Sequence, residues 1–245
     1  STTSRMAATI GYTLESFFRQ AHPDKELLVI DGGSTDETMK VVERFAAPEL
    51  VAVSEPDRGI YDAMNKGLAR FTGDAVGFLN ADDRFKDAHA LEAIAGALQR
   101  GDVAYGDLDV VDAHENGRVV RRWRSARYSP GGFRRGWMPA HPTFYVRRKV
   151  VETVGLFDLR YRVAADYDYM LRAVDLAGFR PVLADWVLVD ILQGGESQRS
   201  LAAHLRHNQE ALDARRRRLG TGALDYALVA KPLRKVGQFL TRSGE

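Results

Sequence analysis

Short apolar segments alternate with amphipathic segments through the first half of the chain, and this alternation is what most restricts its fold. Apolar runs stand at 26–31, 50–55 and 76–79. Segments whose apolar residues have helical spacing lie between them, at 34–46 and 59–71. Strands and helices that alternate with short links predict an α/β fold, with a Rossmann-like, mainly parallel sheet flanked by helices.

The start of the chain departs from this order, because a helical segment at 7–20 precedes the first apolar run. Parallel α/β folds normally begin with a buried strand. We therefore expect the natural protein to have residues upstream of Ser1, with residues 1–3 as the tail of that strand.

The second half is less regular but has the same kinds of element. The whole chain has 45% hydrophobic residues, which is sufficient for a sizeable core. The chain has no Cys, which excludes disulfides and thiolate metal sites, and it has no apolar run of about 18 residues that would span a membrane. Strands are predicted at 103–112, 117–124, 142–148 and 186–192, and helices at 90–100, 149–155, 165–178 (ending at Gly178) and 201–242.

Acidic residues follow three of the predicted strands. Asp31, Glu55 and Asp82 each stand where a strand ends. Ligands of such sheets bind at the carboxyl ends of the strands, so we expect these residues to converge on one crevice. Asp82 and Asp83 are adjacent and repel each other, which indicates either a bound Mg²⁺ or Mn²⁺ or a solvated turn.

A glycine-rich turn follows the first predicted strand in "IDGGSTDET", 30–38. Gly32 and Gly33 allow a ligand to approach closely, and a helix start favours anions. Ser34, with Glu37 three residues later, predicts an N-cap for the next helix. The segment matches neither a Walker loop nor G-x-G-x-x-G, so a nucleotide-binding turn and a plain tight turn both stay open.

Three further side chains have a chemical and a structural interpretation. Arg58 precedes a predicted helix, where it can reach a phosphate. His141 is either a ligand contact or a hydrogen-bonded structural residue. Asp166, at a predicted helix start, is either a cap or a general base that takes a proton from an acceptor hydroxyl.

Taken in their order, these segments resemble the family 2 glycosyltransferases of the GT-A fold. The resemblance runs from the first helix to about residue 200. It is greatest to bacterial enzymes that build exopolysaccharide, O-antigen or glycolipid sugars, including colanic-acid-type fucosyltransferases. The segments that carry it are "VIDGGSTDET", "SEPDRGIYDAMNKG", "FLNADD", "AHPTFYVRR", "GLFDLRYRVAADYDYMLR" and, for the subgroup, "GGES" at 194–197.

The resemblance implies transfer of a sugar from a nucleotide donor to a hydroxyl with inversion at the anomeric carbon. Asp166 matches the catalytic base of the family's E-D pair, in which Ala165 replaces the Glu. Asn80 to Asp82 matches the D-x-D metal motif with Asn in first place, so Asp82, supported by Asp83, would hold Mn²⁺ or Mg²⁺. The positions that match contacts to the donor are Asp31 (to the base), Thr2 or Thr3 (to the nucleoside), Gly32, Asp57, Arg58, Asn65, Asn80 and Asp82.

The resemblance also predicts the domain organisation. Residues 1–200 form the GT-A catalytic domain, with a nucleotide-sugar half of about 1–110 and an acceptor half of about 111–200. Residues 201–245 form a helical basic extension. The acceptor is a glycan or a lipid-linked molecule, and its predicted contacts are His141, Arg134 and Trp137.

Two basic clusters indicate anionic partners. Residues 215–242 contain eight Lys and Arg against one acid, and residues 121–137 are rich in Arg and aromatic residues. Such clusters suit anionic lipid and phosphate-bearing ligands, and a solvated basic face is the structural alternative. We expect a cytoplasmic protein, with peripheral contact to the inner face of the plasma membrane through the C-terminus and no nucleic-acid partner.

Three other classes are weighed against a transferase. A glycoside hydrolase also uses two carboxylates but needs no nucleotide turn or metal motif. A nucleic-acid-binding protein would explain the basic clusters but not the acidic strand ends. A non-catalytic scaffold is kept open by Asn80 and Ala165. The sequence does not name the acceptor, and it favours a UDP- or GDP-linked donor without naming the sugar.

Overall fold

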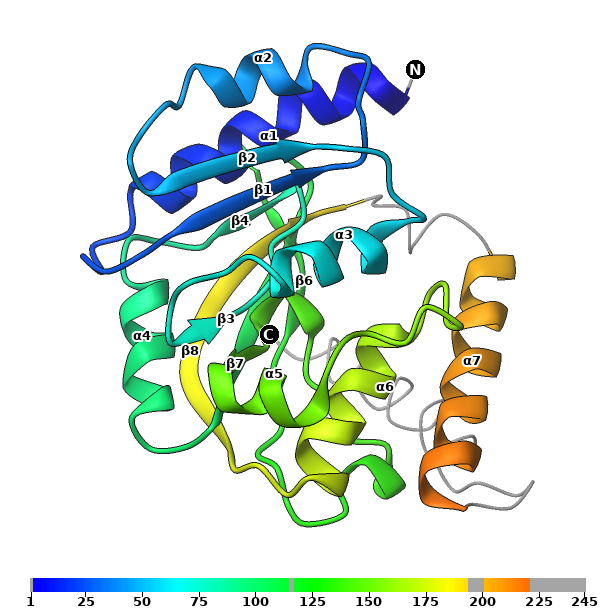
Figure 1. Cartoon of the computed structure of the whole chain (residues 1–245). Helices are drawn as coiled ribbons and strands as arrows, with labels where there is room; N and C mark the ends of the chain where they lie inside the picture. The colour runs from blue at the N-terminus through cyan, green and yellow to red at the C-terminus, as the bar shows by residue number, and fades with distance from the viewer. Residues whose placement is uncertain (1, 115–116, 194–200, 221–245) are drawn as a thin grey trace.

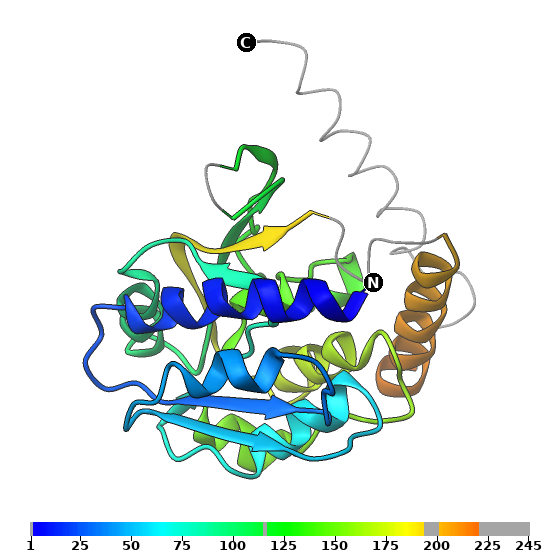
Figure 2. The ribbon, with the colours of Figure 1, turned by 90° about the horizontal axis from the view of Figure 1, so that it is seen from above.

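The structure, a computed structural model, describes residues 2–114, 117–193 and 201–220 (Figure 1). Its first part is a parallel pair of strands, β1 (Leu27–Asp31) and β2 (Leu50–Ser54). Helices α1 (Thr2–Phe18) and α2 (Thr38–Glu43) cover one face of this pair, and α3 (Ile60–Leu68) packs on the other (Figure 1 and Figure 2). The predicted alternation of strands and helices is confirmed here.

A six-stranded sheet forms the centre of the molecule. Its order is β3-β7-β5-β8-β4, and β6 also pairs with β5. β5 and β8 are parallel and the other pairs are antiparallel, so the α/β class is confirmed but the sheet is mixed rather than mainly parallel. One reason is that only residues 112–118 separate β5 from β6, and a connection this short joins antiparallel strands. The strands are β3 (Ala75–Val76), β4 (Asp83–Phe85), β5 (Val103–Val111), β6 (Val119–Trp123), β7 (Tyr145–Arg147) and β8 (Pro181–Leu192).

Strand β5 lies between two hydrophobic cores because alternate side chains of a strand point to opposite faces. Val103 and Tyr105 belong to a core shared with α5 (Arg148–Val154) and α6 (Ala165–Leu171). Ala104 and Leu108 face a second core with α4 (Ala90–Leu98). Figure 1 shows α4 on one side of the sheet and α5 and α6 on the other.

The helix predicted at 165–178 is present in two parts. After α6 comes a π-helical turn, Arg172–Leu176. Gly178 has φ +73°, which suits a residue without a Cβ, and the N–H of Phe179 donates to the carbonyl of Ala173. The predicted end at Gly178 is therefore confirmed.

Helix α7 (Leu201–Leu219) is the described part of the predicted C-terminal extension, and it lies beside α6 in both views (Figure 1 and Figure 2). Ala211 and Ala214 are buried in the same core as α6. No helix within 2–114, 117–193 and 201–220 is both long and apolar enough to cross a membrane. The "GGES" segment and residues 221–245 lie outside the described residues.

Two predictions about local structure are wrong. Thr2 and Thr3 are in the first turn of α1 and not on the tail of a strand. Helix α2 begins at Thr38 rather than after Ser34, because residues 32–34 turn around the side chain of Asp31 instead. The predicted contact of Thr2 or Thr3 with a nucleoside stays a prediction.

Candidate active site

The carboxylate of Asp31 organises the loops at the ends of β1 and β2. Its Oδ2 accepts hydrogen bonds from the backbone N–H groups of Gly33 (3.1 Å) and Ser34 (2.9 Å) and from the hydroxyl of Ser54 (2.6 Å). Burial acts to raise the pKa of Asp31, but the bonds from Ser34, Ser54 and Gly33 outweigh it and lower the pKa. Asp31 is thus held as a carboxylate where a donor base is predicted.

Asp57 reaches the same turn from the loop after β2. One oxygen accepts from the N–H of Gly59 (2.8 Å), and the other lies so close to Gly32 that a Cβ there would be 2.4 Å away. A side chain at position 32 would therefore displace the carboxylate of Asp57 from its present place. The structure brings together three of the residues predicted for donor binding: Asp31, Gly32 and Asp57.

Arg58 and Asn65 differ in their freedom to meet a ligand. The guanidinium of Arg58 pairs with Asp62 (3.1 Å) but is 77% exposed, so it can exchange this partner for a phosphate. Asn65 is buried, and its amide both donates to the carbonyl of Phe157 (3.0 Å) and accepts from its N–H (2.8 Å). Asn65 therefore joins α3 to the segment before α6, a structural role that the sequence did not reveal, and its contact with the donor stays a prediction.

The acidic cluster between β3 and β4 separates into a buried and a partly exposed part. Asp83 is buried in β4 and accepts from the amide of Asn80 (2.8 Å). Burial, together with the charge of Asp82, raises the pKa of Asp83 to about 7. Asp82 is only partly buried, and its carbonyl contacts Nε2 of His114 (2.8 Å). Sequence reasoning did not select His114, because it is far from Asp82 in the chain.

These residues fit one side of a divalent cation site. Mn²⁺ and Mg²⁺ prefer oxygen ligands, and they are often held by one or two carboxylates with the rest supplied by water and phosphate. Asp82 and the amide of Asn80 offer such oxygens, whereas the buried Asp83 faces Asn80 and acts as its support. In the part of the chain that the structure describes, no group of three or more His, Asp or Glu is arranged to hold a metal by itself.

Asp166 stands at the start of α6 and is partly exposed. Its Oδ1 accepts a hydrogen bond from the hydroxyl of Tyr61 on α3 (3.0 Å) and from the N–H of Tyr167 (2.8 Å). Burial and the charge of Asp166 raise the pKa of Tyr61, so the phenol remains a donor. The helix that follows the predicted donor turn is thereby linked to the predicted catalytic base.

Aromatic rings line the surroundings of Asp166. His141 stacks on Phe78 (ring centroids 5.7 Å apart) and meets Phe157 edge-on (6.0 Å). Burial lowers the pKa of His141, and the charge of Asp166 acts in the opposite direction. Phe157 also stacks on Tyr61 (5.6 Å), the partner of Asp166, so His141 belongs to the same aromatic group, and its contact with an acceptor stays a prediction.

The other two predicted acceptor residues are Trp137, which is buried, and Arg134, which is exposed. Trp137 is 8% exposed, its indole N–H donates to the carbonyl of Ala126 (2.7 Å), and its ring packs edge-on against Phe133. It is a core residue in this structure, and its contact with an acceptor stays a prediction. Arg134 is exposed and donates to the carbonyl of Leu219 in α7 (3.2 Å), so this side chain is tied to the C-terminal helix.

Two arginines of α7 make contacts inside the molecule, and the others are exposed. Arg215 is 3% exposed and donates to the hydroxyl of Tyr167 (3.0 Å). Arg217 pairs with Asp213 (2.6 Å) and Arg218 with Asp168 (2.8 Å). Arg215 and Arg218 are therefore tied to α6, whereas Arg216 and Arg217 stay exposed in the described part of the predicted basic cluster 215–242.

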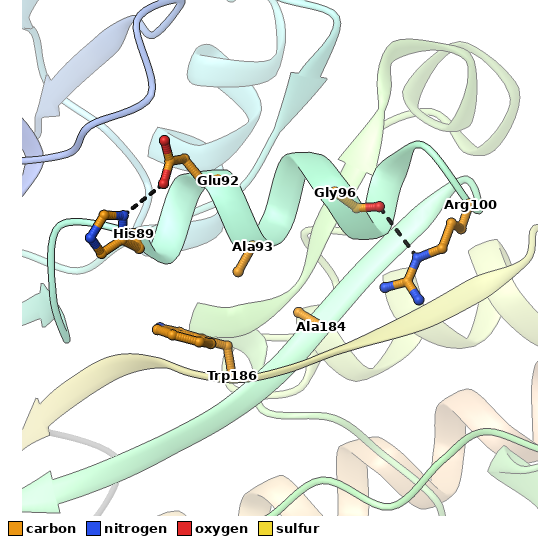
Figure 3. A pocket seen from close by; sticks show the side chains of 7 residues that line it. All are labelled: His89, Glu92, Ala93, Gly96, Arg100, Ala184 and Trp186. Carbon is orange, nitrogen blue, oxygen red and sulfur yellow. Dashed lines mark hydrogen bonds and ion pairs between the residues drawn. The ribbon is translucent and has the colours of Figure 1, made fainter.

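A separate hollow of about 600 Å³ lies between α4 and β8 (Figure 3). The exposed ring of Trp186 forms one wall, and the pair of His89 and Glu92 (2.7 Å) lies at one end. None of the predicted site residues lines it.

A family model described as glycosyl transferase family 2 matches residues 2–155. The chain therefore belongs to this family. A PGL/p-HBAD biosynthesis glycosyltransferase of Mycobacterium tuberculosis is 35% identical over 184 residues, which cover 69% of this chain and 66% of that protein. The chain thus spans just under two thirds of the length of this relative.

Solved structures agree with the predicted fold. TarS of S. aureus, residues 1–349, has a TM-score of 0.64 at 18% identity, covering 91% of this chain and 64% of that one. A mannosyltransferase of Pyrobaculum calidifontis, in complex with GDP-Man and Mn²⁺, has a TM-score of 0.65 at 20% identity, covering 92% and 65%. The fold is the GT-A fold.

Proposed function

We propose that this protein is an inverting glycosyltransferase that moves a sugar from a UDP- or GDP-linked donor to a hydroxyl of a glycan or lipid-linked acceptor. The observation that carries the proposal is the carboxylate of Asp166. It is partly exposed at a helix start, and Tyr61, from the helix after the donor-side turn, donates to it. UDP and GDP donors are favoured because TarS was solved with UDP-GlcNAc and the mannosyltransferase with GDP-Man.

In this mechanism Asp166 accepts the proton of the acceptor hydroxyl. The bond from that oxygen to the anomeric carbon forms while the bond to the diphosphate oxygen breaks on the opposite side, which inverts the configuration. Tyr61 orients Asp166 through its hydrogen bond. Phe157 stacks on Tyr61 (5.6 Å) and meets His141 edge-on (6.0 Å), so Tyr61 is supported through ring contacts.

The donor is held at the ends of β1 and β2 by Asp31 and Asp57, and Arg58 pairs with its diphosphate. A Mn²⁺ or Mg²⁺ ion, held by Asp82 and Asn80, would offset the charge of the leaving diphosphate. Asp83 keeps the Asn80 amide in place through its hydrogen bond.

A screen of nucleotide sugars tests this function, with Asp82→Ala as the informative variant. We expect UDP- or GDP-sugars with Mn²⁺ or Mg²⁺ to raise the unfolding temperature and to be slowly hydrolysed by the wild type. Asp82→Ala should weaken metal-supported binding in calorimetry by about 10-fold or more, while Asp24→Ala, in an exposed loop, should not. Titrations of Asp82→Ala that equal those of the wild type, with and without Mn²⁺, would contradict the metal site.

We further propose that the protein contacts the inner face of the plasma membrane through residues 221–245. A chain ending at Gly220 retains α7 and its contacts with α6, whereas one ending at residue 200 would lose them. Residues 221–245 contain four Lys or Arg, and each gains about 1 kcal/mol near anionic lipid. The chain ending at Gly220 should therefore co-sediment with anionic vesicles far less than the full chain does. Equal co-sedimentation of the full chain and the chain ending at Gly220 would refute the contact.

A further inference from the structure

A carboxylate from α7 holds the loop that leads into α6. Oε2 of Glu210 accepts hydrogen bonds from the backbone N–H groups of Val163 (2.9 Å) and Ala164 (3.1 Å). The glutamate is partly buried and comes from 46 residues further along the chain than Ala164. This is a long-range contact made directly before the helix that carries Asp166.

The start of α6 needs such an acceptor. The first N–H groups of a helix have no partner within it, and the N-cap side chain normally supplies one. In α6 the N-cap is Ala164, which has φ −133° and no side chain that can accept a hydrogen bond. Asp166 is engaged with Tyr167 and Tyr61. Glu210 therefore accepts from the N–H of the N-cap residue itself and of the residue before it, and caps the entry to α6 from outside the local sequence.

Two further contacts fix α7 to the first turn of α6. Arg215 donates to the hydroxyl of Tyr167 (3.0 Å), and Arg218 to the carboxylate of Asp168 (2.8 Å). Glu210 consequently lies on a helix that is packed against α6. Its negative charge also contributes to the raised pKa of Tyr61, after burial and Asp166, which places it within electrostatic reach of the pair formed by Tyr61 and Asp166.

We propose that Glu210 is a positioning residue, which caps α6 from α7 and thereby fixes the carboxylate of Asp166 against Tyr61. Its effect on turnover rests on the proposed transferase function, whereas its hold on the start of α6 does not. Through Glu210, helix α7 accordingly supports the carboxylate of Asp166.

Three variants of α7 test this role. Glu210→Ala removes the acceptor, and Glu210→Gln keeps an acceptor oxygen without the charge. Gln209→Ala is the matched control, because Gln209 is exposed on the same helix. Each is compared with the wild type by hydrogen–deuterium exchange of the peptide covering 161–168 and by turnover of the donor found in the nucleotide-sugar screen.

We expect faster exchange of this peptide in Glu210→Ala, with wild-type rates in Gln209→Ala and an intermediate rate in Glu210→Gln. Displacement of a catalytic group by about 1 Å can cost 100-fold in rate, so kcat of Glu210→Ala should fall by about 10- to 100-fold. The Kd for the nucleoside diphosphate should stay within about twofold, since the donor site is untouched. Formate added to Glu210→Ala should restore part of kcat.

The outcomes separate this proposal from the proposed function. Wild-type exchange at 161–168 in Glu210→Ala overturns the capping role, whatever the protein catalyses. Faster exchange with unchanged kcat overturns the role in positioning Asp166. A wild type that turns over no nucleotide sugar refutes the transferase function and leaves the exchange experiment to decide the capping role alone.

Discussion

Asp166→Asn should abolish sugar transfer while it leaves nucleotide binding almost intact. Asparagine has the same shape, and its Oδ1 can still accept from Tyr61 and from the N–H of Tyr167, so the start of α6 should keep its conformation. The amide cannot take a proton at neutral pH, and general-base catalysis contributes about 10²–10⁴-fold. We therefore expect kcat to fall by about that factor, with the Kd for UDP or GDP unchanged in calorimetry.

The control for this experiment is Asp185→Asn. Asp185 pairs with Arg127 at an exposed position, and asparagine tolerates its positive φ of 52°. This variant should turn over like the wild type. Turnover of Asp166→Asn at the wild-type rate would remove Asp166 from the mechanism.

Among these variants, Asp168→Asn should lower the free energy of unfolding the most. Asp168 has a fully buried side chain that pairs with Arg172 (2.7 Å) and Arg218 (2.8 Å). Removal of its charge leaves two guanidinium groups in a poorly solvated place, and breaking a buried pair typically costs about 3–5 kcal/mol. Because the Arg218 side chain is 30% exposed, we expect the lower end, about 3 kcal/mol of the free energy of unfolding.

Urea unfolding measures this loss, and Asp185→Asn again serves as the control. Its ion pair with Arg127 has side-chain exposures of 57% and 74%, so the same substitution should cost less than about 1 kcal/mol there. Equal losses in the two variants would show that the group around Asp168 does not hold α7 on the catalytic domain.

The sequence predicted the elements whose signals are local. The apolar runs became β1 and β2 at their predicted places, and Gly178 ended its helix because a left-handed residue favours glycine. The family was identified from contiguous segments, above all "EPDRGIYDAMNKG", and the family model agrees. Sequence patterns did not predict that most strand pairs are antiparallel, because pairing depends on connections and partners distant in the chain.

The roles of side chains that depend on contacts distant in the chain were likewise not predicted from the sequence. Trp137 was predicted to contact an acceptor from its place in the acceptor half of the family's fold, and only the tertiary structure shows that its ring is buried against Phe133. The arginines at 215–218 read as a basic surface, yet Arg215 and Arg218 are tied to α6. A run of arginines in the sequence does not show which hydrogen-bond acceptors on a helix distant in the chain will lie next to it.

By itself, the sequence determined the family, the order of strands and helices in the first half, and the candidate carboxylates Asp82 and Asp166, since each depends on residues close together in the chain. Only the tertiary structure decided how those carboxylates are supported. It set Asp83 behind Asn80, brought Tyr61 to Asp166, and placed Glu210 at an uncapped helix start. Hydrogen bonds of this kind act over about 3 Å in space, so they depend on which elements pack together and not on their separation in the chain.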